Sequence, residues 1–191
     1  MNNVFHDWFS TQFKHKLLDR YASQYIGLNV LQQICKFPLI LETGTVRMEN
    51  DWGAGMSTVV FGEYIKHHDG KLITIDNSSE NIKICKEITK AYSNITYVVD
   101  DSLKYLSTIN FKIDFLYLDS MDCPINGDAS DAQTHNLNEF KLCEPHLNSR
   151  ALIMIDDVGF SNGGKGLKTH EYLSDGGYLQ LFNNQQSVWL K

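Results

Sequence analysis

Hydrophobic residues along most of this chain come in short runs that alternate with longer stretches of mixed polarity. The runs lie at residues 37–41, 71–76, 95–100, 113–119 and 151–156. Two of the stretches between them, residues 57–68 and 79–92, have the length and spacing of helices. Strands that are apolar throughout and separated by helices are typical of a parallel sheet covered on both faces. The pattern therefore predicts an α/β fold, a Rossmann-like doubly wound sheet with five parallel strands.

The C-terminal part of the chain breaks this alternation. Residues 178–184 and 187–191 are both strand-like, and only Asn184 to Gln186 are left to turn between them. So short a connection joins antiparallel neighbours, because a parallel crossover needs a dozen or more residues. We therefore expect a C-terminal antiparallel hairpin, which brings the sheet to seven strands with helices on both faces.

The N-terminal segment, residues 1–36, is aromatic and amphipathic. Its large apolar side chains recur every three or four residues, at Phe5, Trp8, Phe9, Phe13 and Leu17. This spacing predicts one or two helices that form a cap on the domain of residues 37–191. Closure over a bound ligand and a homodimer contact are alternative roles for the same segment.

Composition narrows the class of protein. A chain of 191 residues that is 42% hydrophobic suits one globular unit with a sizeable core. The net charge is −6 and the basic residues are dispersed, which argues against nucleic acid as a partner and favours a small-molecule substrate. The four cysteines lack the spacing of zinc or redox motifs. The N-terminus has no signal-peptide or membrane-span pattern, so we expect a cytoplasmic protein without membrane contact.

Acidic residues follow four of the five predicted parallel strands. They are Asp76, then Asp100 and Asp101, then Asp119, and finally Asp156 and Asp157. Ligands of open α/β sheets bind outside the carboxyl ends of the strands. Each aspartate alone could be a helix cap or a turn residue. Their recurrence at the same topological place predicts that they gather around one crevice.

A glycine-containing loop follows the first strand, "LETGTVRMENDWGAGMST", in which seven residues separate its two halves. This loop, the aspartates after the next three strands and the final hairpin together resemble the class I S-adenosylmethionine-dependent methyltransferases, over about residues 37–191. Within that superfamily, Asp119 with the pair Asp156 and Asp157 resembles the metal-dependent O-methyltransferases of the catechol, caffeoyl-coenzyme A and macrocin types. The form of the loop is most similar to the macrocin branch, which acts on sugars and natural products.

The resemblance implies a set of residues that bind S-adenosylmethionine. They are Glu42, Gly44, Thr45, Gly53, Gly55, Ser57, Thr58, Asp76, Asn77, Asp101, Ser102 and Asp119. Gly44 would let the backbone approach the methionine part, and the second half of the loop would open a helix whose free N–H groups favour the cofactor carboxylate. Ser57 and Thr58 also suit an ordinary helix cap. Asp76 would accept hydrogen bonds from both ribose hydroxyls, and Asp101 would lie beside the adenine, with Asp100 as its rival.

The resemblance also implies a metal site at Asp119, Asp156 and Asp157. Carboxylates packed together need positive charge between them, which Mg²⁺ or a similar divalent cation would supply. Such an ion would hold the substrate and lower the pKa of its hydroxyl. In the alternative, Asp156 caps a loop and Asp157 is exposed.

The resemblance leaves the proton acceptor open, and no side chain is needed for this role if the metal makes the substrate acidic enough. The catechol and caffeoyl types carry a lysine three residues after the first aspartate, whereas this chain has Asp122 there. Besides Asp119, the catalytic candidates are His135 and Lys165. His135 lies four residues before Glu139, so the two could be a purely structural pair. Lys165, in a glycine-rich loop, could close over the substrate or be a surface lysine.

The leading hypothesis is therefore a metal-assisted O-methyltransferase acting on a hydroxylated small molecule. The alternatives are an NAD-type oxidoreductase, since Asp76 also suits a nicotinamide ribose, and an inactive methyltransferase-like binding protein. Residues 46–52, which interrupt the loop, would either contact the substrate and cover the site or form an exposed bulge.

Overall fold

In the part of the chain that the structure describes, seven strands form one mixed sheet in the order β3-β2-β1-β4-β5-β7-β6. A computed structural model describes residues 4–53 and 56–191. The strands are β1 (Leu39–Thr43), β2 (Lys71–Asp76), β3 (Ile95–Val99), β4 (Ile113–Leu118), β5 (Leu147–Ile155), β6 (Leu179–Asn183) and β7 (Ser187–Leu190). The first five are parallel, and β7 lies antiparallel between β5 and β6. The predicted fold class, including the C-terminal hairpin, is confirmed.

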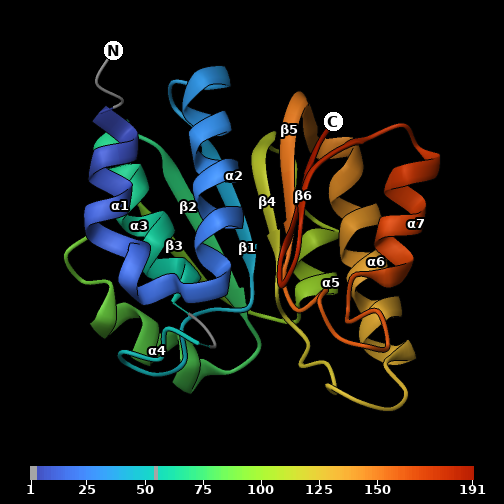
Figure 1. The fold of residues 1–191 in the computed structure, drawn as a ribbon. Coiled ribbons are helices and arrows are strands. Elements are labelled where there is room, and N and C mark those ends of the chain that lie inside the picture. Colours follow the sequence, from blue (N-terminus) through green and yellow to red (C-terminus); the bar gives the residue numbers. More distant parts are fainter. Residues whose placement is uncertain (1–3, 54–55) are drawn as a thin grey trace.

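Helices cover both faces of this sheet (Figure 1). They are α1 (Val4–Leu17), α2 (Tyr21–Ile34), α3 (Ser57–His68), α4 (Ser79–Ile88), α5 (Ser102–Leu106), α6 (Ser130–Cys143) and α7 (Leu167–Asp175), with short 3-10 helices η1 (Leu18–Arg20) and η2 (Glu144–His146). Figure 1 shows α1, α2 and α3 on one face and α5, α6 and α7 on the other. Over the described ranges, no helix combines the length and the apolar character that crossing a membrane requires.

Adjacent residues of the central strands serve opposite hydrophobic cores. Phe115 of β4 packs in the cluster that contains Phe9 and Leu28 of the N-terminal helices. Leu116, the next residue, packs with Phe140 of α6 on the other face. Strands buried on both faces are apolar at most successive positions, and this explains the hydrophobic runs in the sequence. The N-terminal helices share the core of the sheet.

Both boundaries of β1 and the start of β5 differ from their predicted positions by two residues or more, and the other strand boundaries by one at most. β1 was expected at residues 37–41 but runs from Leu39 to Thr43, so polar Glu42 and Thr43 lie inside the strand and are fully buried. β5 begins at Leu147, four residues before the predicted 151–156, because Leu147 still pairs with β4 across a register irregularity. Polar residues in a buried strand hide its boundary from the hydrophobic pattern.

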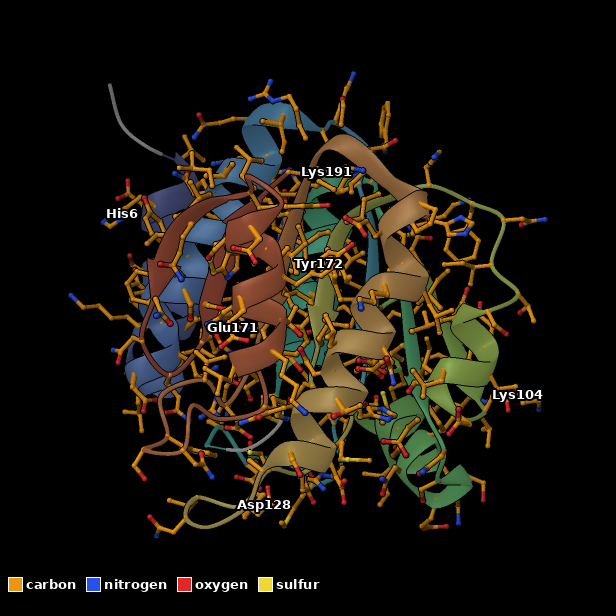
Figure 2. The ribbon with its side chains drawn as sticks, turned by 90° about the vertical axis from the view of Figure 1, so that its right-hand side faces the viewer. His6, Lys104, Asp128, Glu171, Tyr172 and Lys191 are labelled. Atoms are coloured by element: carbon orange, nitrogen blue, oxygen red, sulfur yellow. The ribbon has the colours of Figure 1, made fainter. Side chains whose placement is uncertain are left out.

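The carboxyl ends of the parallel strands meet at one end of the molecule, at the bottom of Figure 1. Figure 2 shows Asp128, in the loop between β4 and α6, at this end and Lys191 at the opposite end. The loops that follow β1, β2, β4 and β5 therefore converge, as the positions of the aspartates predicted.

Candidate functional site

Two adjoining cavities lie at the carboxyl ends of the strands. The first has a volume of about 520 Å³ and the second about 340 Å³. Both are lined by Gly44, Asp76, Asn77, Ser120 and Asp122. The first extends toward Arg20, Asp119 and the aspartate pair. The second extends toward Asp101, Ser102 and His135.

Gly44 directly follows β1, contacts the backbone at the ends of β2 and β4, and lines both cavities. Its φ of +82° lies in the left-handed region, and a Cβ built there would be 2.4 Å from the carbonyl oxygen of Asp119. Its N–H also donates to the carbonyl of Ile75 at 2.8 Å. The loop thus needs glycine here so that it can pack against the backbone at the end of β4. Thr45 and Gly53 line the first cavity, whereas predicted Gly55 lies outside the described residues.

Glu42, Ser57 and Thr58 form a buried cluster behind the glycine loop. Ser57 Oγ donates to Glu42 Oε1 at 2.6 Å, and Thr58 Oγ1 donates to Oε2 at 2.8 Å. Burial raises the pKa of Glu42 to about 7, although these two hydroxyl hydrogen bonds oppose the shift. None of the three lines either cavity. They anchor the start of α3 to β1. The contact with the cofactor that the resemblance implies for these residues stays a prediction.

Asp76 lies between the two cavities at the end of β2. Its Oδ1 accepts hydrogen bonds from the Ser78 backbone N–H at 2.8 Å and from Asn81 Nδ2 at 3.1 Å. These contacts fix the carboxylate while leaving acceptor capacity on both oxygens. Asn77 lines both cavities beside it. This is the position that the resemblance implied for recognition of a ribose.

His135 of α6 lines the second cavity, where its ring lies between the start of α5 and the loop after β4. Its Nε2 is 3.2 Å from Ser102 Oγ and 3.0 Å from Ser120 Oγ. The same nitrogen lies 3.3 Å from Glu139 Oε1, and this carboxylate raises the pKa of the imidazole. Asp101 lies beside Ser102 and caps α5 by accepting a hydrogen bond from the Lys104 N–H. The structure therefore groups His135 with the predicted adenine-binding residues.

Asp119, Asp156 and Asp157 come together as predicted. One oxygen from each carboxylate lies within 4.8 Å of the others. Positive charge between them comes from two side chains of the chain itself. Arg20 of η1 donates from Nε and Nη2 to the two oxygens of Asp156, at 3.0 and 3.1 Å, and from Nη2 to Asp157 Oδ1 at 3.1 Å. Lys165 Nζ lies 2.6 Å from Asp119 Oδ1 and 3.5 Å from Asp157 Oδ2.

The hydrogen bonds and ion pairs of the three carboxylates show whether their oxygens are free to bind a divalent cation. Tyr117 Oη, 3.4 Å from Asp119 Oδ2, provides the remaining donor. All six carboxylate oxygens therefore have a partner within the protein. A guanidinium or an ammonium cannot ligate a metal ion, and each would have to leave before one could bind. The residues present do not fit Mg²⁺ in this arrangement.

Lys165 is buried, contrary to the alternative of a surface lysine. Its side chain is only 2% exposed. Although burial lowers the pKa of an ammonium, the carboxylates of Asp119, Asp156 and Asp157 outweigh it and raise the pKa of Lys165 above its usual value. Burial raises the pKa of Asp119 to about 7, and the charge of Lys165 opposes that rise. Lys165 therefore stays protonated and holds Asp119 in place.

Residues 46–52 run past the first cavity, and residues 47–50 are exposed. Arg47 lines this cavity and lies 3.3 Å from Asp122, on the loop after β4. Trp52 packs near Phe13 of α1, with ring centroids 6.2 Å apart. The end of the segment thus contacts the N-terminal helices, whereas contact of the segment with the substrate stays a prediction.

Arg20 and Asn81, which contact the aspartates of this site, were not among the residues predicted from the sequence. Arg20 lies 136 positions before Asp156, in a segment whose pattern indicates only amphipathic helices. Asn81, which orients Asp76, lies on the first turns of α4. Its spacing of five residues from Asp76 was the available signal, because a side chain just inside a helix can reach back to the preceding strand end.

Residues 51–158 match a family model described as a methyltransferase domain. No curated protein sequence matches the chain. Among solved structures, the O-methyltransferase NovP is 11% identical, with a TM-score of 0.66, 91% of this chain covered and 80% of that chain. The methyltransferase PaMTH1 of Podospora anserina, solved with S-adenosylhomocysteine bound, is 13% identical, with a TM-score of 0.63 and coverages of 98% and 85%. A methyltransferase from Geobacter sulfurreducens is also 13% identical, with a TM-score of 0.57 and coverages of 97% and 85%.

Proposed function

We propose, because this chain belongs to the family of methyltransferase domains, that it transfers a methyl group from S-adenosylmethionine to a hydroxyl oxygen of a small molecule. The family match confirms the resemblance to the class I S-adenosylmethionine-dependent methyltransferases. It also removes the basis for the oxidoreductase alternative. The observation that carries the proposal is the pair of adjoining cavities joined at Gly44 and Asp76.

The second cavity suits the adenosine part of the cofactor. Asp76 offers an ionised two-oxygen acceptor for the ribose hydroxyls at the boundary between the cavities. Ser102 and His135 supply hydrogen-bonding groups at the far side, where the adenine would lie. The methionine part would then extend past Gly44 toward Thr45 and Gly53, into the first cavity.

The first cavity supports a polar, hydroxylated acceptor such as a sugar or a natural product. Its lining combines hydrogen-bond acceptors with donors, represented by Asp157, Arg47 and Gln185. Phe160 adds an aromatic face to the same wall. A methyl-accepting molecule with several hydroxyl groups can form hydrogen bonds with the polar side chains of this cavity, whereas a flat apolar molecule would leave them unpaired.

Asp119 is the group best placed to accept the proton. S-adenosylmethionine supplies an electrophilic methyl group when it is bound. The hydroxyl oxygen of the small molecule would bond to that methyl carbon while the carbon–sulfur bond breaks and its electron pair goes to sulfur. The hydroxyl proton would go to the Asp119 carboxylate. Lys165 orients this carboxylate through its 2.6 Å contact with Oδ1. A pKa of about 7 suits a general base near neutral pH.

A methyl-transfer assay tests this proposal. S-adenosylmethionine with a radiolabelled methyl group would be incubated with hexoses, amino sugars and phenols, and the position of the label determined by mass spectrometry and NMR. We expect an O-methyl product and a kcat about 100-fold lower in Asp119→Asn, as removal of a general base predicts. The matched control is Asp175→Asn, an exposed residue at the end of α7. Methylation of nitrogen or carbon, or wild-type turnover by Asp119→Asn, would contradict the proposal.

A further inference from the structure

We infer that Arg20 and Lys165 occupy the place of a divalent cation in this site, so that the enzyme works without a metal ion. The inference rests on the proposed function and names the groups that balance its carboxylates. Two positive side chains face three negative ones, Asp119, Asp156 and Asp157. The cluster keeps one net negative charge next to the site of a positively charged sulfonium.

The geometry of Arg20 excludes a second cation at the same oxygens. Its guanidinium contacts both oxygens of Asp156, at 3.0 and 3.1 Å, in the bidentate arrangement that arginine forms with carboxylates. The same Nη2 reaches Asp157 Oδ1 at 3.1 Å. Mg²⁺ requires oxygen ligands at about 2.0–2.1 Å and would have to enter between the guanidinium and its partners. Two positive centres in so small a space repel each other.

Arg20 is held in this position from several directions. Its Nη1 donates to the Gly53 carbonyl at 2.7 Å, in the cofactor loop. Its own carbonyl accepts a hydrogen bond from Ser23 Oγ at 2.9 Å, and Ser23 also contacts Gln186 at 2.6 Å, in the turn of the hairpin. The side chain is 14% exposed. Movement of the Arg20 side chain away from the carboxylates would break its contacts with the glycine loop and with the aspartate pair together.

Lys165 is fixed by the loop that carries it. Its backbone N–H donates to the Asp157 carbonyl at 3.1 Å. The preceding residue, Gly164, has a φ of +60°, and a Cβ there would be 1.8 Å from that same carbonyl oxygen. The loop therefore packs directly on the backbone of Asp157, and this packing buries the lysine against its two carboxylate partners. Both cations belong to the folded structure, so a metal ion would bind only by disrupting it.

Manganese binding to the wild-type protein tests the inference without any acceptor substrate. The protein would be stripped with a chelator and titrated with Mn²⁺, followed by electron paramagnetic resonance of the free ion. We expect no saturable binding up to about 1 mM Mn²⁺, the weak end of protein sites for hard cations. We also expect the affinity for S-adenosylhomocysteine to be the same with and without Mg²⁺. Saturable micromolar binding of Mn²⁺ that Asp156→Asn abolishes would overturn the inference.

Removal of both cations should create the metal site that they exclude. We expect the double variant Arg20→Met/Lys165→Met to bind Mn²⁺ at least 10-fold more tightly than the wild type, on the order of 100 μM. The matched control, Arg150→Met/Lys83→Met, removes exposed cations and should gain nothing. A double variant that keeps its circular dichroism spectrum yet gains no Mn²⁺ binding would overturn the assignment. If that variant does not fold, the wild-type titration decides alone.

The proposed function fails separately. If S-adenosylhomocysteine does not bind the wild type, the methyltransferase proposal is refuted, whereas the manganese titration still reports on the carboxylate cluster.

Discussion

The buried carboxyl group of Glu42 predicts a specific dependence of stability on pH. Glu42 is fully buried in β1 and accepts hydrogen bonds from Ser57 and Thr58. Burial raises its pKa from the ordinary 4.5 to about 7. The folded state therefore holds a proton that the unfolded chain releases between these two pH values. The difference of 2.5 between them corresponds to about 3 kcal/mol of unfolding free energy.

The sign of the effect follows from the raised pKa. Below about pH 4.5 the carboxyl group is protonated in both states, and Glu42 imposes no electrostatic cost. As the pH rises from about 4.5 to about 7, the folded protein keeps a proton that the unfolded chain releases, so the free energy of unfolding falls; above about 7 the buried group ionises and the cost no longer grows. In Glu42→Gln this cost is absent, because glutamine is neutral and the hydroxyls of Ser57 and Thr58 can rotate to pair with it. The variant should therefore gain stability relative to the wild type as the pH rises, by about 3 kcal/mol between pH 4.5 and 8.

Urea unfolding of the two proteins at half-unit pH intervals measures this difference. The control is Glu171→Gln, an exposed residue of α7 (Figure 2), whose unfolding free energy should run parallel to that of the wild type. Glu42→Gln should also keep its affinity for S-adenosylhomocysteine, since Glu42 lines neither cavity. A constant stability difference between Glu42→Gln and the wild type at all pH values would refute this reasoning.

Three further predictions concern the loops around the cavities. In urea titrations, Gly44→Ala should lower the unfolding free energy by at least about 3 kcal/mol, and the control Gly177→Ala by about 1–2 kcal/mol. Both glycines have a positive φ, but in the described part of the chain no atom lies within 4 Å of a Cβ built at Gly177. Lys165→Met should lower the unfolding free energy by about 3 kcal/mol, because it leaves buried carboxylates unpaired. Adding Asp119→Asn should restore at least half of this loss, and strictly additive losses in the double variant would contradict the pairing of Lys165 with Asp119. His135→Ala should weaken S-adenosylhomocysteine binding about 10-fold in calorimetry, through the loss of its contacts with Ser102 and Ser120, and unchanged affinity would exclude that role.

The sheet and the aspartate cluster were predictable from the sequence because each depends on a local pattern. A parallel strand buried on both faces is apolar at most of its positions, and residues that follow such strands must emerge at the same end of the sheet. Asp76, Asp119 and Asp156 were therefore grouped correctly without any knowledge of their contacts. The short turn before β7 fixed the antiparallel hairpin in the same way.

The partners of those aspartates were not predictable, because they lie far away in the chain. Arg20 reaches Asp156 across 136 positions and Lys165 reaches Asp119 across 46. Packed carboxylates need positive charge between them, and a metal ion was the only source of that charge that local sequence patterns suggested. Glu42 was misplaced for a different reason. A polar residue inside a buried strand looks like the start of a loop, so only the hydrogen bonds with Ser57 and Thr58 show that it belongs to the core.

Calorimetric titration of the protein with S-adenosylhomocysteine tests the central claim most directly. We predict saturable binding to the wild type and about 100-fold weaker binding to Asp76→Ala, because two charge-assisted hydrogen bonds to the ribose are together worth about 3 kcal/mol. Asp175→Ala, at the exposed end of α7, should bind like the wild type. Absence of binding at millimolar ligand, or equal affinity of the wild type and Asp76→Ala, would contradict a cofactor site at the carboxyl ends of these strands.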